Sequence, residues 1–492
     1  MNKKYLFFSF IVLINIFVFF PVFSIFFGSD DFFVLSQVQV ENIKGFFELF
    51  LPHSQVVYYR PLGIQFYFWF VKFFFGLNPL AFHLITFIFH IANSILVYYI
   101  AQKLGNNEKI TYLTCFLWSL SPIHYLSLAW IVNFSFIFVT FFFFLSLLFW
   151  LNKKNNLSYI SFFIGMFVNE FILVLPVFLI FYELLIGKSK TKKFLKQLSP
   201  FFLIIAPYFL LRLFLPGKYE GVYVWKFDFD ILNTIKWYFL WSLGWAETMK
   251  DQMKNFYYIR TSFRNSFPEK TFIYLSAFFI FIACFLILPT CLLLFKGLKT
   301  YTEFIKKEIN IFLTCFILFF LALLFVIFTS DHIYPHYLTI AGFGIYFGFS
   351  YFFVKALDFT KKRILEYVFI FFWAGWWIFL SFTTVRFNAQ VHWVPRNANF
   401  AKKLIYDLKE KTDSKNGKIY ITSNSEDKKI ALAQENALKV FLGNGWRTYF
   451  LKPKELENKL KKLYDKDYVY YTQENEFKIN KLKFEKINIY FF

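Results

Sequence analysis

The chain has 492 residues, of which 58% are hydrophobic and 17% charged, and its mean hydropathy is +0.49. A soluble domain buries apolar residues along one stripe of each helix, whereas successive windows here are apolar on all sides for the roughly 20 residues that cross a bilayer. This composition excludes an ordinary soluble protein. The net charge of +22 does not indicate nucleic-acid binding, because Lys and Arg gather in short loops between apolar segments and in the C-terminal tail.

The basic residues between the apolar segments set the predicted topology. Lys3 and Lys4 precede the first apolar stretch, so the N-terminus is expected in the cytoplasm and the chain in the plasma (inner) membrane. Eleven spans are predicted, at residues 5–27, 80–101, 110–127, 131–151, 157–168, 170–187, 197–215, 271–295, 308–329, 337–356 and 363–385. With this count the basic loops lie inside and the tail lies outside. The segment 61–76 is short and contains Lys72, so an amphipathic helix at the outer interface is expected there.

Polar residues gather at the outer ends of these predicted spans. They are Asp30, Asp31, Tyr58, Tyr59, Arg60, His124, Trp130, Asn169, Glu170, the loop 216–270, Asp331, His332, His336 and Arg386. The inner loops are short and consist of Lys, Asn, Ser and Gly, which is typical of loops that only set orientation. Chemistry is therefore expected on the extracytoplasmic side.

Several segments occur in an order that resembles a known family. They read SDDFF, YYRPL, FFGLNPLAFH, FHIANSILVYYIAQKLG, SPIHYLSLAW, NEFILVLPVFLIFYELL, SPFFLIIAPYFLLRLF and DHIYPHYLTIAGFG. Over residues 20–390 this order resembles the membrane half of the GT-C glycosyltransferases, above all the protein O-mannosyltransferase-like enzymes and their bacterial relatives. The animal relatives continue into helical repeats of about 34 residues, a period that this tail lacks. They also often read D-R-Y-L-Y-L-P where His332 stands here.

The resemblance implies an inverting enzyme that moves a sugar from a polyprenyl-phosphate donor to an acceptor hydroxyl, with a carboxylate of the first outer loop as base. Asp30 and Asp31 are the candidates, and a carboxylate within hydrogen-bond reach would take the proton of the hydroxyl. Adjacent helical residues point about 100° apart, so the other Asp is expected to bind acceptor or metal. A divalent metal ion is the one cofactor considered, and Asp31 is its candidate ligand. The expected partners are the lipid-linked donor, the bilayer and a protein or glycan acceptor.

A cation that faces the leaving phosphate would stabilise the transition state of this transfer. Arg60 is the first candidate for this role. The further candidates are His332, His336 and Arg386. Glu170 begins a span, and an ionisable group there is a functional candidate, so it is the secondary carboxylate and a candidate for acceptor binding.

Structural alternatives stand beside each of these roles. The Asp pair can simply begin a solvated loop, and Arg60 can be an interfacial anchor before a helix that Pro61 initiates. His83 and His90 lie about two helical turns apart, too far to share one metal ion, so hydrogen bonds between helices are the preferred interpretation. Trp225, Trp237, Trp241 and Trp245 are interpreted as an aromatic belt at the interface, with sugar stacking as the alternative.

The tail differs in composition from the membrane half. We divide the chain into an all-α, GT-C-like membrane domain at 1–391 and a small extracytoplasmic α/β domain at 392–492. Strands are predicted at 418–423, 446–451 and 468–473, and helices at 426–443 and 454–464. Alternating strands and helices favour a parallel sheet, and no glycine-rich phosphate loop follows the first strand.

Three functional classes follow from these patterns. The leading prediction is a glycosyltransferase that uses a polyprenyl-phosphate sugar, and the alternative is a lipid-linked sugar flippase or another polytopic transporter. A non-catalytic scaffold is the third class. A transporter is expected to carry polar groups halfway along its spans. The polar residues here gather at one membrane face, which favours chemistry on a lipid headgroup.

Overall fold

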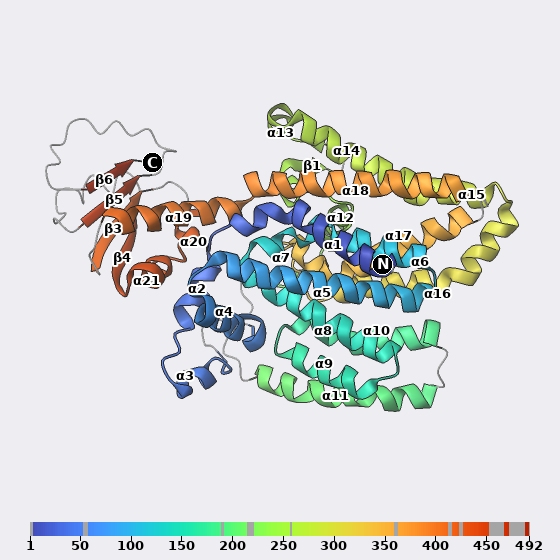
Figure 1. Cartoon of the computed structure of the whole chain (residues 1–492), viewed down its shortest axis with the longest axis horizontal. Coiled ribbons are helices and arrows are strands. Elements are labelled where there is room, and N and C mark those ends of the chain that lie inside the picture. The colour runs from blue at the N-terminus through green and yellow to red at the C-terminus, as the bar shows by residue number, and fades with distance from the viewer. Residues whose placement is uncertain are drawn as a thin grey trace.

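Helices dominate this chain because a bilayer leaves backbone groups no water to bond. In hydrocarbon every N–H and C=O must be paired within the protein, and a helix pairs them within one segment. The computed structural model describes residues 3–52, 58–187, 191–213, 221–255, 258–358, 363–411, 416–422, 427–451, 467–471 and 488–491. Figure 1 shows an elongated helical bundle with a small strand-containing unit at one end. We call this the tail-side end of the bundle.

The first half of the chain contains short helices and turns as well as the longer helices of the bundle. The short helices and turns are η1 Phe20–Ser24, α2 Asp30–Gln37, α3 Ile43–Glu48, η2 Pro61–Phe66, α4 Tyr67–Phe75, η3 Pro122–His124, α7 Tyr125–Ala129, η4 Ile131–Asn133, η5 Glu170–Val174 and η6 Glu183–Gly187. The bundle helices are α1 Lys3–Phe19, α5 Pro79–Gly105, α6 Glu108–Ser119, α8 Phe134–Leu151, α9 Asn155–Met166, α10 Leu175–Tyr182 and α11 Thr191–Leu213.

The second half follows the same division. Its short elements are η7 Gly221–Tyr223, α12 Asp230–Ser242, η8 Glu247–Gln252, β1 Met253–Asn255, β2 Tyr258–Ile259, α13 Thr261–Ser266, η9 Ala283–Ile287 and η10 Pro335–Tyr337. Its bundle helices are α14 Pro268–Ile282, α15 Leu288–Leu294, α16 Leu298–Ala322, α17 Leu338–Asp358 and α18 Arg363–Val391. The strands β1 and β2 pair antiparallel.

Local sequence explains where several bundle helices begin. The Asn78 side chain accepts a hydrogen bond from the Leu80 backbone N–H at 3.1 Å, and Pro79 takes the first helical position of α5. The Asn107 side chain caps α6 in the same way, through the N–H of Lys109 at 2.9 Å. Such residues satisfy the free N–H groups of the first turn. In both cases only two or three residues separate the capped helix from the helix before it.

A multi-pass membrane protein is confirmed at the level of its helices. Within the described residues six stretches are long and apolar enough to cross a membrane: Lys3–Ser24, Pro79–Gly105, Ile131–Leu151, Glu170–Gly187, Pro335–Asp358 and Tyr367–Val391. The eleven predicted spans stay a prediction. The helix α6 ends at Ser119, well short of residue 127, and α16 runs from Leu298 to Ala322 rather than from 308 to 329.

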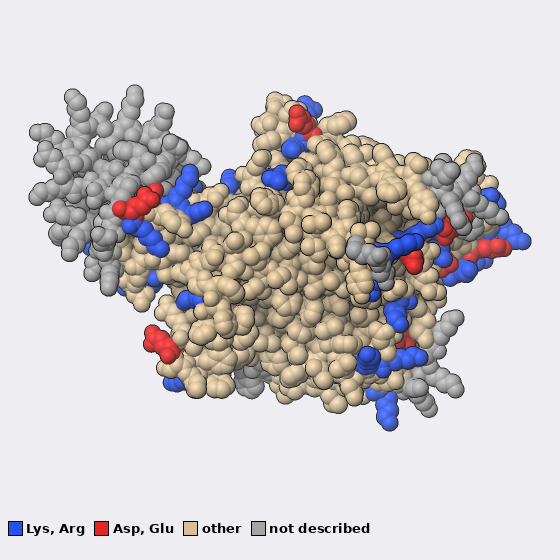
Figure 2. All heavy atoms as spheres, in the orientation of Figure 1, with Lys and Arg blue, Asp and Glu red and all other residues tan. Residues whose placement is uncertain are grey.

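The surface of the bundle fits a lipid environment. On the face in Figure 2, Lys, Arg, Asp and Glu lie mainly at the two ends, with a broad, largely uncharged band between them. Large apolar side chains are exposed along the helices, among them Leu203, Phe272 and Phe371. A soluble monomer rarely exposes so much contiguous apolar surface. The segment 61–76 forms η2 and α4, and α4 exposes Phe73, Phe74 and Phe75; at this length it is too short to span.

The tail contains a four-stranded parallel sheet. Its strands are β3 Asn416–Thr422, β4 Gly445–Leu451, β5 Asp467–Tyr471 and β6 Asn488–Phe491, in the order β4-β3-β5-β6. The register pairs Ile419 with Thr448 on one side of β3 and with Tyr468 on the other. The predicted parallel arrangement therefore occurs in the described strands.

The tail helices differ from the prediction. The tail begins with a helix that the sequence analysis omitted, α19 Trp393–Lys411. The single helix predicted at 426–443 is wrong, because the chain forms α20 Asp427–Ala431 and α21 Asn436–Leu442. Ala433 and Gln434, with φ of 45° and 63°, occupy the left-handed region between them and end the first helix. The predicted helix 454–464 lies outside the described residues.

The tail unit, α19 and the elements after it, is packed against the segment from η1 to the start of α2. The ring of Phe441 lies 5.4 Å from that of Phe26 and 6.1 Å from that of Phe32. The backbone N–H of Ser29 donates to the carbonyl of Ala431 at 2.9 Å. The tail unit is therefore fixed against the segment that carries Asp30 and Asp31.

Candidate functional site

The neighbouring residues Asp30 and Asp31 have different environments. Asp31 is 2% exposed, and its two carboxylate oxygens accept backbone N–H groups from Gly28 at 3.1 Å and Val132 at 2.9 Å. Burial raises the pKa of Asp31 to about 8, although both backbone donors favour its charged form. Asp31 thus ties the start of α2 to the turn before α8, and both of its oxygens are occupied.

The side chain of Asp30 reaches solvent. Its carboxylate has no hydrogen-bond or ion-pair partner among the residues that the structure describes. Protein atoms surround it on its other sides, and this burial raises the pKa of the Asp30 carboxyl. A carboxylate with a raised pKa and a free oxygen is a stronger base than an ordinary exposed carboxylate.

The backbone before the pair is held in an uncommon conformation. Ser29 has a φ of 53°, which is costly for a residue with a side chain. Gly28 lies against α19, and a Cβ atom there would come within 3.3 Å of the Ala398 backbone. The strain at Ser29 is maintained by contacts on both sides, a situation common at functional sites. It sets the direction in which α2 starts and so the direction of Asp30.

Arg60 is positioned by close contact between η2 and the turn that precedes η5. The N–H of Leu62 donates to the carbonyl of Phe167 at 2.9 Å. A Cβ atom on Gly63 would lie 2.3 Å from the carbonyl oxygen of Val168, so only glycine allows this approach. These contacts bring the two segments together and place Arg60 opposite Glu170.

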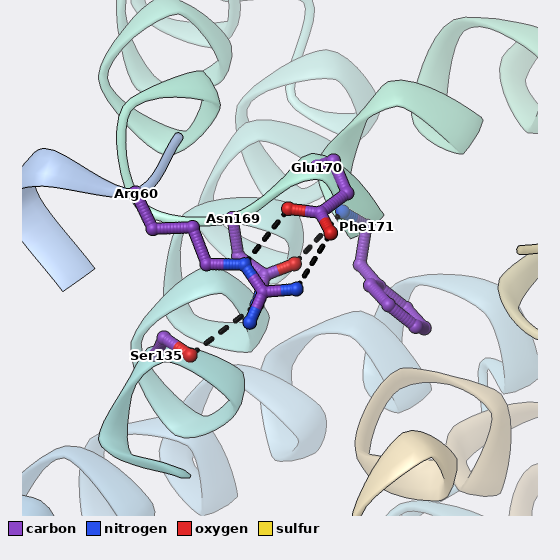
Figure 3. Close-up of polar contacts among 5 residues, drawn as sticks. All are labelled: Arg60, Ser135, Asn169, Glu170 and Phe171. Carbon is purple, nitrogen blue, oxygen red and sulfur yellow. Dashed lines mark hydrogen bonds and ion pairs between the residues drawn. The ribbon is translucent and has the colours of Figure 1, made fainter. Parts of the chain in front are cut away.

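Arg60 and Glu170 form a two-point ion pair, drawn in Figure 3. The Nε of Arg60 donates to one carboxylate oxygen at 2.8 Å and Nη2 to the other at 2.6 Å. The side chains are 13% and 20% exposed. Burial lowers and the Glu170 charge raises the pKa of Arg60, with a net upward shift, so the guanidinium stays charged. The sequence predicted both residues as candidates but did not predict that they pair.

Neighbouring residues hold this ion pair in one orientation. The guanidinium of Arg60 lies 4.6 Å from the ring centre of Tyr58 and 5.3 Å from that of Phe136. Asn169 donates to the Ser135 hydroxyl at 3.3 Å and accepts the N–H of Phe171 at 3.1 Å, which caps the helix that carries Glu170 (Figure 3). Arg60 is therefore fixed, and its Nη1 group is not bonded to Glu170.

Aromatic and imidazole rings extend from this ion pair. The ring of His332 lies 4.3 Å from that of Tyr223 and 4.9 Å from that of Tyr334. His336 lies 4.2 Å from Tyr337 and is buried. We call this group the tail-side cluster: Asp30, Tyr58, Arg60, Glu170, Tyr223, His332, Tyr334, His336 and Tyr337.

Two tyrosines lie within electrostatic range of both Asp30 and Arg60. Burial and then the Asp30 charge raise the pKa of Tyr58, and Arg60 opposes them. The same three influences act on Tyr223, whose pKa is also raised. Burial, assisted by the charges of Lys250 and Arg60, lowers the pKa of His332 to about 4, so this ring is neutral near pH 7. The phenols of Tyr58 and Tyr223 therefore remain neutral hydrogen-bonding groups near both the Asp30 carboxylate and the Arg60 guanidinium.

The remaining predicted cation is not part of this group. Arg386 lies on α18 with its guanidinium 5.0 Å from the ring of Phe382. No contact found among the described residues joins it to Asp30 or Arg60. The structure instead reveals His392, whose Nε2 donates to Glu247 at 2.6 Å while its Nδ1 accepts the Val394 N–H at 3.2 Å. No sequence pattern indicates this pair, because its members are 145 residues apart.

Other sequence interpretations have definite outcomes. His83 bonds the carbonyls of Leu128 and Ile25, both at 2.9 Å, and His90 bonds Asn15 and the Ser119 carbonyl, so bonding between segments is confirmed. The aromatic belt is wrong for three of its four tryptophans. Trp237, Trp241 and Trp245 are at most 4% exposed, and of the four only Trp225 is exposed. In the part of the chain that the structure describes, no group of three metal-binding side chains is present.

An apolar cavity of about 450 Å³ lies between α12, α16 and α17. Its lining includes Phe239, Phe316, Phe349 and Gly344, and it contains no residue of the tail-side cluster. Apart from the Cys315 thiol, its lining side chains carry no titratable group. It is therefore not a candidate for the chemistry, although its surface suits a hydrocarbon chain.

No protein-family model matches this chain, and no characterised protein matches it significantly. The function is therefore argued from the site.

Proposed function

We propose that this protein is an integral membrane glycosyltransferase that moves a sugar from a polyprenyl-phosphate donor to an acceptor hydroxyl on the extracytoplasmic side. The observation that carries the proposal is that one cluster at one end of the bundle contains both an unbonded carboxylate, Asp30, and a fixed cation, Arg60. Both roles are needed for transfer from a phosphate leaving group, and both groups lie at the end of the spans where a lipid headgroup would be.

In the proposed reaction the acceptor hydroxyl gives its proton to the Asp30 carboxylate as its oxygen bonds the anomeric carbon. The bond between that carbon and the phosphate oxygen breaks, and the electron pair leaves with the phosphate. Attack from the face opposite the phosphate inverts the anomeric carbon. Proton removal by a positioned base contributes about 10²–10⁴-fold to such a rate.

The leaving phosphate gains negative charge in this step. Arg60 faces it with the N–H groups that Glu170 does not use, and the neutral rings of Tyr223 and His332 offer further donors. Preorganised donors are effective because they need no rearrangement as charge develops. Glu170 acts here as a positioning residue that keeps the guanidinium in one orientation, and the acceptor role predicted for it is replaced by this one.

Asp31 is assigned a structural role in this proposal. Its two oxygens are engaged by backbone N–H groups, whereas an incoming hydroxyl needs an open oxygen. A divalent metal is not required by the proposed reaction. Because the donor carries a long hydrocarbon chain, the apolar cavity beside α16 and α17 is compatible with a lipid-linked substrate.

The test uses membranes that contain the wild-type chain, Asp30→Asn or Arg60→Ala at equal expression, supplied with a panel of radiolabelled polyprenyl-phosphate sugars. Sugar transfer and release of polyprenyl phosphate by wild type, with loss of both in Asp30→Asn, are expected. A wild-type protein that releases no lipid phosphate from any donor but moves labelled lipid across sealed vesicles would instead establish the transporter.

A further inference from the structure

A second, polar cavity lies where the tail unit meets the first outer loop. It has a volume of about 710 Å³. We call it the tail pocket. One wall is a face of α2 with Asp30, Phe33 and Gln37, and the opposite wall is the turn between α20 and α21 with Lys429, Gln434 and Asn436.

We propose that the tail pocket binds the acceptor and that this acceptor is a saccharide. This inference rests on the proposed function for the role of Asp30. Asp30 is the one residue that belongs both to the tail pocket and to the tail-side cluster. An acceptor in the pocket would therefore present a hydroxyl to Asp30 from the side opposite the donor phosphate.

The chemistry of the walls favours a saccharide over an apolar ligand. The pocket carries primary amides, a hydroxyl and charged groups, and its partly buried aromatic ring is that of Phe33. Amides donate and accept hydrogen bonds at once, which suits neighbouring hydroxyl groups on a sugar ring. A phenyl face beside them suits the apolar face of such a ring. The size lies within the roughly 300–1,000 Å³ of ordinary ligand pockets, enough for a short oligosaccharide.

The walls are held apart by packing rather than by a flexible linker. The Phe441 ring of α21 lies against Phe26, Phe27 and Phe32 at 5.4 to 6.1 Å, so the two elements that form the walls are packed on each other. The hydrogen bond from Ser29 to Ala431 joins the two walls beside Asp30. Gln434 is in the left-handed region, and its exposed side chain is part of the pocket lining.

The test measures saccharide binding to the purified full chain in detergent, with a set of defined neutral and anionic oligosaccharides as probes. Gln434→Ala combined with Asn436→Ala should weaken binding of the bound probes at least tenfold and leave the thermal midpoint unchanged. If the double variant is unstable, Gln434→Glu, which keeps the shape of the side chain, replaces it in the binding test. Lys44→Ala is the matched surface control, since that side chain is 86% exposed on α3 and outside the pocket.

Arg60→Ala separates this inference from the proposed function. It should bind the oligosaccharides as wild type does while transfer is lost. If no saccharide binds, or if the Gln434 and Asn436 variants bind like wild type, the tail pocket is not the acceptor site. Binding of hydroxyl-bearing peptides at the same residues, without saccharide binding, would overturn the acceptor class. If the protein binds saccharides but transfers no sugar from any donor, the saccharide site in the tail pocket is supported and the proposed glycosyltransferase activity is refuted.

Discussion

The two ends of the helical bundle are built differently. At the tail-side end, ionisable groups are buried or partly buried and have defined partners, as with Arg60 and Glu170 at 2.6 Å. At the opposite end, a pair at two helix ends, Lys109 and Asp358, is 3.7 Å apart with both side chains more than a third exposed. The buried carboxylates toward that end, Glu183 and Glu308, accept from the neutral groups of Trp150 and Tyr351 and have no ion-pair partner among the described residues. Burying charge costs free energy, and exposed loops avoid that cost. The two ends therefore differ in how their charged side chains are paired, and the buried ion pair marks the end where chemistry is expected.

The largest expected effect comes from Asp30. Asp30→Asn removes the proposed base but keeps the size of the side chain, so transfer should fall by about 10²-fold or more. The thermal midpoint should stay unchanged, because Asp30 has no bonded partner among the described residues. Initial transfer rates in membranes measure the first effect, and thermal unfolding in detergent measures the second.

Asp31→Asn is the matched control for that variant. An amide has one acceptor oxygen, so either Gly28 or Val132 loses its partner, which costs about 1–3 kcal/mol. We therefore expect a lower thermal midpoint and a smaller loss of transfer per folded molecule than for Asp30→Asn. Equal losses of transfer in the two variants would contradict the division of roles between the neighbouring carboxylates.

The ion pair offers the next largest effect. Removing either partner leaves the other charge partly buried, so Arg60→Ala and Glu170→Ala should each destabilise by about 2 kcal/mol or more. The double variant should cost less than the sum of the two, with a coupling of about 1–2 kcal/mol. A double-mutant cycle on chemical unfolding in detergent measures this. Strict additivity would show that the pair does not stabilise the tail-side end.

A smaller effect concerns pH. The folded protein lowers the pKa of His332 from 6.5 to about 4, so the unfolded chain binds the proton first as the pH falls. The stability contributed by the neutral ring is complete above about pH 6.5 and is lost progressively toward pH 4. Thermal midpoints of wild type and His332→Gln across this window test the expectation. The variant should lose less stability than wild type, and parallel curves would contradict the shift.

The smallest effect belongs to the opposite end. Lys109→Ala removes one member of an exposed pair, and such pairs contribute about 0–1 kcal/mol. We expect no measurable change in transfer and a change in the free energy of unfolding below about 0.5 kcal/mol. A loss of transfer comparable to that of Arg60→Ala would remove the contrast between the two ends.

Long apolar runs explain what the sequence predicted well. The helices near 80–101, 131–151 and 337–356 occur as α5, α8 and α17, because an uninterrupted apolar run can satisfy its backbone only as a helix. The parallel strands of the tail were also predictable from alternating segments. The break after Ala431 was not, because Ala433 and Gln434 carry no turn signal and rarely adopt a left-handed conformation.

The candidate site was predictable residue by residue but not as an arrangement. Asp30, Arg60 and Glu170 were candidates because polar residues gather at one end of the predicted spans and because their segments resemble those of the GT-C enzymes. Their partners depend on which helices are neighbours, and hydropathy does not contain that information. Arg60 and Glu170 are 110 residues apart, and Gly63 alone allows the close approach that joins them. The burial of Trp237 and Trp241 escaped prediction for the same reason, since lipid and protein interior are equally apolar.

The hydrogen bond between Ser29 and Ala431 has a consequence for biosynthesis. The ribosome makes the wall that carries Asp30 early and the opposite wall late, with the bundle helices between them. The two walls of the tail pocket can come together only after those helices have been inserted into the membrane. A nascent chain would hold its carboxylate without the surface that presents an acceptor to it. With the proposed acceptor site in the tail pocket, transfer could begin only after the tail has been translated.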